Sequence, residues 1–207
     1  GDGMLRLDHI AVAGETRQAA TDYIQDCLKV APLAAGQHFH FSTHNHLWGM
    51  GEACYLESIA VDPQAPSLAY PRWFGLDRFA GPPRIASWIL ATDNIQESLA
   101  RLGPEFGTPL RLERDAYTWD ISVSDTGDLP LGGYGPALIE WQPPAHPCQN
   151  LPDSGCRLIS LQIQHPRANL MQALLSELIR DERICFSTGP AQISAEIQTD
   201  HGLVTLK

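Results

Sequence analysis

Leu7-Asp8-His9-Ile10-Ala11-Val12 is a short apolar strand that carries one imidazole, and an amphipathic helical pattern follows it within a few residues. The same order of strand and helix returns at residues 85–90 and again at 157–163. Two or three further strand-like runs follow each helical pattern. The sequence therefore predicts an α+β fold built from three successive βαβββ units.

The overall composition narrows the classes of partner. The 207 residues include 14 Lys and Arg against 24 Asp and Glu, which gives a formal net charge of −10. Nucleic acids and anionic membranes bind clustered cations, and no such cluster is present, so we expect neither as a partner. No apolar run approaches about 18 residues and no signal-peptide pattern is found, so we expect a cytoplasmic protein. The five cysteines are odd in number and lack CxxC spacing, which argues against a disulfide framework or zinc knuckle.

Two proline-rich connectors divide the chain, at residues 62–83 and 142–155. The first is too aromatic for a solvated linker, so we expect it to pack over another part of the protein. We predict modules at 4–62 and 84–142 within one domain over 4–148, and a third module at 156–207.

Aligning the three units by pattern reveals an asymmetry. The position of His9 is occupied by Trp88 in the second unit and by Leu161 in the third. Glu57, in the last strand of the first unit, aligns with Glu140 of the second. The first two units thus carry polar groups on otherwise apolar strands, where an unpaired carboxylate is costly.

Several short motifs, in this order, resemble the glyoxalase-like branch of the vicinal oxygen chelate superfamily. The resembling stretches are LDHIAVAG at 7–14, GQHFHFSTHN at 36–45, YLESIAV at 55–61, the second strand and helix, GPALIEW at 135–141, and His146-Pro147. The resemblance implies that the first two βαβββ modules form one cup-shaped mixed sheet. The third module then corresponds to the C-terminal extension of that branch.

The resemblance also implies a metal site in the cup. Metal-using members take one ligand from the first and one from the last strand of each module, which assigns His9, Glu57 and Glu140. Trp88 stands at the fourth position and cannot ligate, so the four-ligand centre of glyoxalase I is not reproduced. One imidazole and two carboxylates suit a divalent ion such as Mn²⁺, Fe²⁺, Ni²⁺ or Zn²⁺. The alternative is that both carboxylates accept hydrogen bonds from neighbouring polar groups or arginines, without a metal.

Other side chains are candidates for the pocket. The histidines between residues 38 and 46 either lie exposed on an edge or loop, or face the cup as a general base; the candidates for that base are His38 and His46. Thr43 and Asn45 match the branch's motif and are expected in the substrate pocket. The aromatic residues are either core or pocket wall, and those assigned to the pocket are Trp88, Trp119 and Trp141.

Two hypotheses about function follow. The first is a metal-dependent lyase, isomerase or ring-cleaving dioxygenase that acts on a small organic substrate. The protein could assemble as a homodimer. The second is a metal-free protein that binds or sequesters a small molecule in the same cup. No nucleotide cofactor is expected, because the sequence lacks GxGxxG and P-loop motifs.

Overall fold

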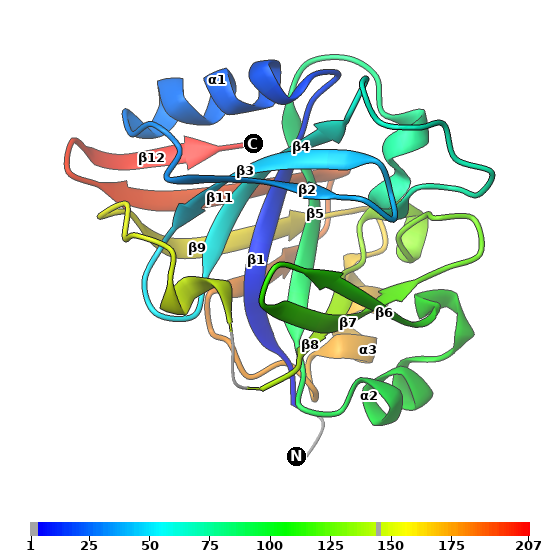
Figure 1. Ribbon diagram of the computed structural model, residues 1–207. Coiled ribbons are helices and arrows are strands. Elements are labelled where there is room, and N and C mark those ends of the chain that lie inside the picture. Colours follow the sequence, from blue (N-terminus) through cyan, green and yellow to red (C-terminus); the bar gives the residue numbers. More distant parts are fainter. Residues whose placement is uncertain (1–3, 144–145) are drawn as a thin grey trace.

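The computed structural model describes residues 4–143 and 146–207 and has a mixed α+β architecture (Figure 1). Its strands are β1 (Arg6–Ala13), β2 (Ala34–His38), β3 (Thr43–Gly49), β4 (Tyr55–Val61), β5 (Arg84–Ala91), β6 (Thr108–Arg114), β7 (Tyr117–Val123), β8 (Ala137–Trp141), β9 (Arg157–Gln164), β10 (Ile184–Ser187), β11 (Gln192–Thr199) and β12 (Gly202–Leu206). The α-helices are α1 (Arg17–Leu28), α2 (Ile95–Leu102) and α3 (Ala168–Leu175). Short 3₁₀ helices are η1 (Trp73–Arg78), η2 (Pro104–Phe106), η3 (Leu131–Gly133) and η4 (Pro147–Gln149).

The first two units build one curled sheet of eight strands. Its order is β2-β3-β4-β1-β5-β8-β7-β6, so each unit places its first strand at the centre. Within each unit the first and last strands pair in parallel, and the two units join through the antiparallel pair β1 and β5. The predicted pairing of two βαβββ modules into a curled sheet is confirmed. We call the concave face of this sheet the cup.

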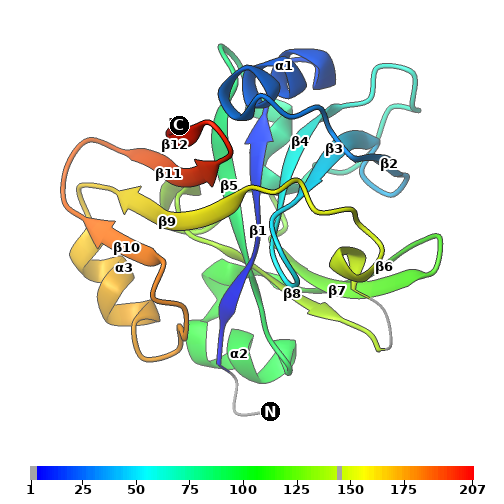
Figure 2. The same cartoon turned by 90° about the vertical axis from the view of Figure 1, so that its left-hand side faces the viewer.

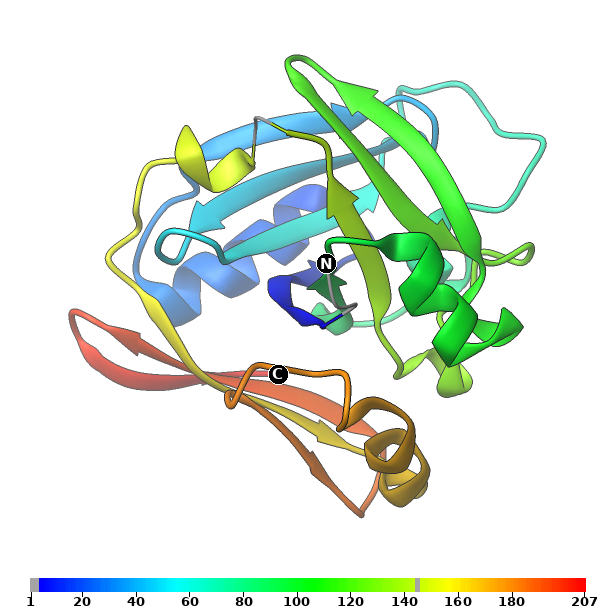
Figure 3. The same cartoon turned by 90° about the horizontal axis from the view of Figure 1, so that it is seen from below.

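The third unit keeps the βαβββ order of elements but arranges its strands differently. Its sheet has the order β10-β9-β11-β12, so its first strand pairs with the second and third strands and not with the last. The expectation that it copies the topology of the other two units is therefore corrected. This sheet forms a separate layer that lies over the outer face of β1 and β5 (Figures 2 and 3).

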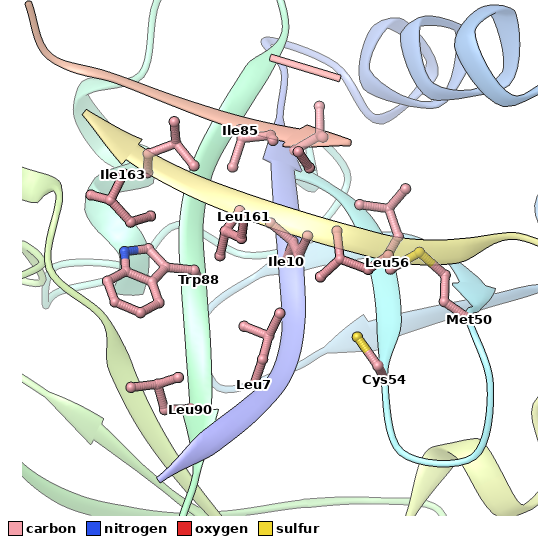
Figure 4. Packing of buried hydrophobic residues seen from close by; sticks show 14 of the residues in the cluster. Leu7, Ile10, Met50, Cys54, Leu56, Ile85, Trp88, Leu90, Leu161 and Ile163 are labelled. Carbon is pink, nitrogen blue, oxygen red and sulfur yellow. The ribbon is translucent and has the colours of Figure 1, made fainter. Parts of the chain in front are cut away.

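Apolar side chains fill both faces of the curled sheet. On the outer face, Trp88, Leu161 and Ile163 belong to one cluster that joins β1 and β5 to the third unit (Figure 4). A second cluster lies on the concave face and includes Trp73 and Phe74 of η1. The aromatic connector thus packs onto the cup, as its composition indicated.

Capping residues fix where the helices begin. The side chain of Thr16 accepts a hydrogen bond from the backbone N–H of Ala19 and so caps the start of α1. The side chain of Asn94 caps α2 by accepting from the N–H of Glu97. In the described part of the chain, no helix is long and apolar enough to cross a bilayer.

Candidate functional site

The cup encloses a small cavity of about 30 Å³. Alternation along β1, β3 and β4 directs His9, Asn45 and Glu57 to the concave face. The cavity is lined by His9, His38, Asn45, Leu47, Tyr55, Glu57, Trp73, Phe74, Arg114, Trp119, Ile121, Ile139 and Trp141. A few polar groups thus converge on an aromatic hollow, which is the usual composition of a small-molecule site.

His9 lies between two buried carboxylates. Its Nδ1 atom is 2.7 Å from Oδ2 of Asp8, and its Nε2 atom is 3.4 Å from Oε2 of Glu57. Its ring stacks on Tyr55, with the ring centroids 4.4 Å apart. Because these contacts hold both ring nitrogens and one ring face, the orientation of His9 is fixed.

The contacts of His9 assign different roles to its two ring nitrogens. Asp8 is ionised, so Nδ1 of His9 keeps its proton and donates it to Asp8. Nε2 of His9 faces Oε2 of Glu57 at 3.4 Å, so a proton carried by either group lies next to an acceptor on the other. Burial raises the pKa of Glu57, while His9, Asn45 and Arg114 oppose that rise. The His9–Glu57 pair can accordingly accept or deliver a proton at the cavity.

Asp8 holds this arrangement in place from the side of β1. Burial alone would raise its pKa, but hydrogen bonds and charge from His146 and His9 lower it to about 2. Its Oδ1 atom also accepts from Nε1 of Trp141 at 3.0 Å and lies 2.9 Å from Nε2 of His146. Nδ1 of His146 accepts the N–H of Cys148, so Nε2 is the nitrogen that donates to Asp8.

A second chain of hydrogen bonds approaches Glu57 from the other side. Nδ2 of Asn45 donates to Oε1 of Glu57 at 2.9 Å and lies 3.5 Å from Nε2 of His38. Nδ1 of His38 is 3.1 Å from Oγ1 of Thr43, which also accepts from Nε1 of Trp73. Burial, and next the charge of Arg114, lower the pKa of His38 to about 3, so its imidazole is neutral.

The structure brings together seven of the residues singled out from the sequence. They are His9, His38, Thr43, Asn45, Glu57, Trp119 and Trp141. Trp119 and Trp141 pack with their ring centroids 5.3 Å apart on one wall of the cavity. Thr43 lies behind this lining and positions His38.

Glu140 and Trp88 lie on the opposite face of the sheet, which corrects their expected positions. Ile139 and Trp141 of β8 line the cavity, so Glu140 between them points outward, and its Oε1 accepts the N–H of Ile95 at 2.8 Å. Trp88 is fully buried in the outer cluster, where its Nε1 donates to the carbonyl of Tyr134. Neither side chain reaches the cup.

His46 also lies outside the cup. Thr43 and Asn45 are the residues of β3 that face the cup, and His46 points to the opposite face of the sheet. Its Nδ1 atom lies 2.8 Å from Oγ1 of Thr21 on α1. The expectation of a base at His46 is corrected accordingly. The turn between β2 and β3 separates its orientation from that of His38.

The donor set can be tested against a divalent metal. His9 and Glu57 are adjacent, but the second module contributes apolar Ile139 and Trp141 where further ligands are needed. Within residues 4–143 and 146–207, no three His, Cys, Asp or Glu side chains are arranged to hold an ion. Because structural and catalytic metal sites commonly use three or four protein ligands, the residues present do not fit the implied metal.

Three contributors to the site were missed from the sequence. Asp8 sits beside His9 on an apolar strand, and a carboxylate in such a strand is a usable signal. Arg114 ends an edge strand and gives no signal of its own, because only the curl of the sheet brings it to the cup. Trp73 lies in the connector at 62–83. The aromatic composition predicted that this connector packs over another part of the protein, but not that it packs on the cup.

A family model and one solved structure agree with this architecture. A family model described as a glyoxalase-like domain matches residues 7–179. A structure titled as a hypothetical protein from Staphylococcus aureus is 15% identical, with a TM-score of 0.65 over 91% of this chain and 88% of its own. Methylmalonyl-CoA epimerase from Mycobacterium tuberculosis, also 15% identical, covers 67% of this chain and 88% of its own with a TM-score of 0.43. No curated protein matches the chain. The chain belongs to the glyoxalase-like domain family.

Proposed function

We propose that the cup binds a small organic molecule and that the His9–Glu57 pair exchanges a proton with it, without a metal ligated by the protein. The observation that carries this proposal is the contact of 3.4 Å between Nε2 of His9 and Oε2 of Glu57, backed by ionised Asp8. Burial raises the pKa of the Glu57 carboxyl above its usual range, which favours its use as a general acid or base.

The chemistry supported is transfer of a proton to or from a carbon or oxygen next to a carbonyl. When the unprotonated pair removes a proton from the substrate, that proton comes to lie between Nε2 and the carboxylate. The electron pair stays on the substrate as an enolate, which the polar groups of the cup would stabilise. Returning the proton to the substrate restores the pair.

Deuterium exchange tests the proposal before the substrate is known. Small 2-oxo- and 2-hydroxycarboxylates and their amides are incubated with the protein in D₂O with a chelator, and exchange beside the carbonyl is followed by NMR. We expect catalysed exchange with the wild type and its loss in Glu57→Gln. Glu140→Gln is the matched control, because it makes the same change on the outer face of the sheet.

Each result has a defined meaning. Exchange that persists in Glu57→Gln overturns the role of the pair. Exchange that requires added Mn²⁺, Fe²⁺, Ni²⁺ or Zn²⁺ and disappears with chelator overturns the metal-free assignment and restores the metal-dependent hypothesis.

A second candidate is a protein that binds or sequesters a small molecule without chemistry. It is favoured by the engagement of both Glu57 oxygens with protein groups, Oε1 with Asn45 and Oε2 with His9. Saturable quenching of tryptophan fluorescence without any exchange would support this alternative.

A further inference from the structure

Arg114 closes the seam of the cup. The curled sheet ends at β2 on one side and β6 on the other, and these two edges approach each other across the cavity. The guanidinium of Arg114, on β6, lies over the Cα of Gly36, on β2, so closely that a Cβ atom at Gly36 would collide with Nη1. Glycine at this position leaves the room that the guanidinium occupies.

The guanidinium faces the cavity without an ion-pair partner in the described part of the chain. Its charge nevertheless acts on the site, because it lowers the pKa of Glu57 and that of His38. Arg111, three residues earlier on the same strand, faces outward and pairs with Asp120 at 2.6 Å. Within β6, therefore, the outward arginine is neutralised and the inward one is available to a ligand.

A second unpartnered group lies at the same place. Oδ1 of Asn45 is buried and accepts no hydrogen bond from any residue that the structure describes. The same Cβ position on Gly36 that meets the guanidinium is 3.0 Å from this oxygen, so both groups border one spot. A buried acceptor needs a donor, which a ligand hydroxyl can supply.

We propose that Arg114 holds the carboxylate of a small organic acid and that Oδ1 of Asn45 accepts its hydroxyl. The planar guanidinium can bind a carboxylate through two parallel N–H···O bonds. The cavity of about 30 Å³ has roughly the volume of one water molecule, so its wall must move to admit even a ligand of three carbon atoms. The ligand class is thus a short hydroxycarboxylate; this inference rests on the proposed function and names the substrate class of the same site.

Three probes of nearly equal size separate charge from hydroxyl. Lactate carries both groups, lactamide lacks the charge, and propionate lacks the hydroxyl. Binding is followed by the fluorescence of the tryptophans that line the cavity, in the wild type, Arg114→Gln and the control Arg111→Gln. We expect lactate to bind about tenfold to hundredfold more tightly than lactamide, and more tightly than propionate.

Arg114→Gln should abolish the preference for lactate over lactamide, whereas Arg111→Gln should retain it. Near-ultraviolet circular dichroism of each variant reports whether the cup is intact, and Arg114→Lys should recover part of the preference in an intact cup. Equal binding of lactate and lactamide, no saturable binding of lactate, or a preference unchanged in Arg114→Gln overturns the proposal. Propionate binding as tightly as lactate overturns the role of Asn45.

These outcomes are independent of those for the proposed function. Glu57→Gln should lose deuterium exchange while it still prefers lactate over lactamide. Suppose that the protein catalyses deuterium exchange with neutral amides and binds lactate and lactamide equally. The assignment of Arg114 to a carboxylate would then be wrong, while the proton transfer by the His9–Glu57 pair would stand. If Glu57→Gln still catalyses deuterium exchange and still prefers lactate over lactamide, the proton-transfer assignment would be wrong and the carboxylate assignment would stand.

Discussion

Replacing Asp8 by Asn tests whether this carboxylate holds the site together. Asp8 is buried and receives hydrogen bonds from His9, His146 and Trp141. Its pKa falls from 3.8 to about 2 on folding, and each unit corresponds to about 1.4 kcal/mol, so ionised Asp8 stabilises the fold by about 2 kcal/mol at pH 7. Loss of good acceptor geometry for three donors adds to this, and we expect Asp8→Asn to cost about 2–4 kcal/mol.

The pH dependence distinguishes this charge from a simple packing defect. A depressed pKa stabilises the native state above the unfolded value of 3.8, and that stabilisation is lost as the pH falls towards about 2. The electrostatic part of the Asp8→Asn penalty should therefore fall to about 1 kcal/mol at pH 3. Urea denaturation of both proteins at pH 7 and pH 3 measures the difference. A penalty equal at the two pH values, or below about 1 kcal/mol at pH 7, would refute the assignment.

Glu57→Gln provides the comparison of opposite sign. The pKa of Glu57 is raised on folding, so its ionisation opposes folding as the pH rises through the native pKa. We expect Glu57→Gln to be neutral or stabilising at pH 7, and to differ least from the wild type in acid. Both variants remove one buried carboxylate charge, and therefore only their different surroundings can produce opposite effects.

Four other substitutions or measurements test the remaining placements. Trp88→Ala should destabilise the protein by about 3–5 kcal/mol in urea denaturation, because it empties the outer cluster, and Trp88→Phe should cost less. Glu140→Ala should cost about 1 kcal/mol by removing an acceptor at the start of α2, with lactate binding unchanged. The imidazole NMR signals of His38 should show no titration from about pH 4.5 to 8, given its pKa of about 3. Gly36→Ala should leave the fold intact and weaken lactate binding, because the new methyl group displaces the flexible end of Arg114.

The strand patterns of the sequence were sufficient for the curled sheet of the first two units. They were not sufficient for the strand order of the third unit or for which side chains enter the cup. His9 and Glu57 were found because each interrupts an apolar strand on the parity that faces inward. Trp88 was misplaced because the unit alignment was displaced by one residue: His9 lies opposite Ile89 in the sheet, and Trp88 opposite Ile10. A displacement of one residue reverses the face of a strand.

The positions of Glu140 and Arg114 could not be predicted because they depend on how the whole sheet curls. Glu140 was placed by analogy with Glu57, but β8 directs its neighbours Ile139 and Trp141 inward, so the carboxylate faces α2. The role of Arg114 depends on a contact between strands at opposite ends of the sheet order. Such a contact has no local sequence pattern and follows only from the curvature of the whole sheet.

The four-stranded sheet covers the junction of β1 and β5, where the two halves of the cup meet. Its apolar side chains therefore complete a hydrophobic layer that the first 150 residues cannot close for themselves. A protein built in this way should unfold as one cooperative body, and separating the chain at 147–155 would yield two pieces with exposed apolar surface in place of two domains. The geometry of His9 then depends on residues more than 150 positions away that pack on the opposite face of the sheet.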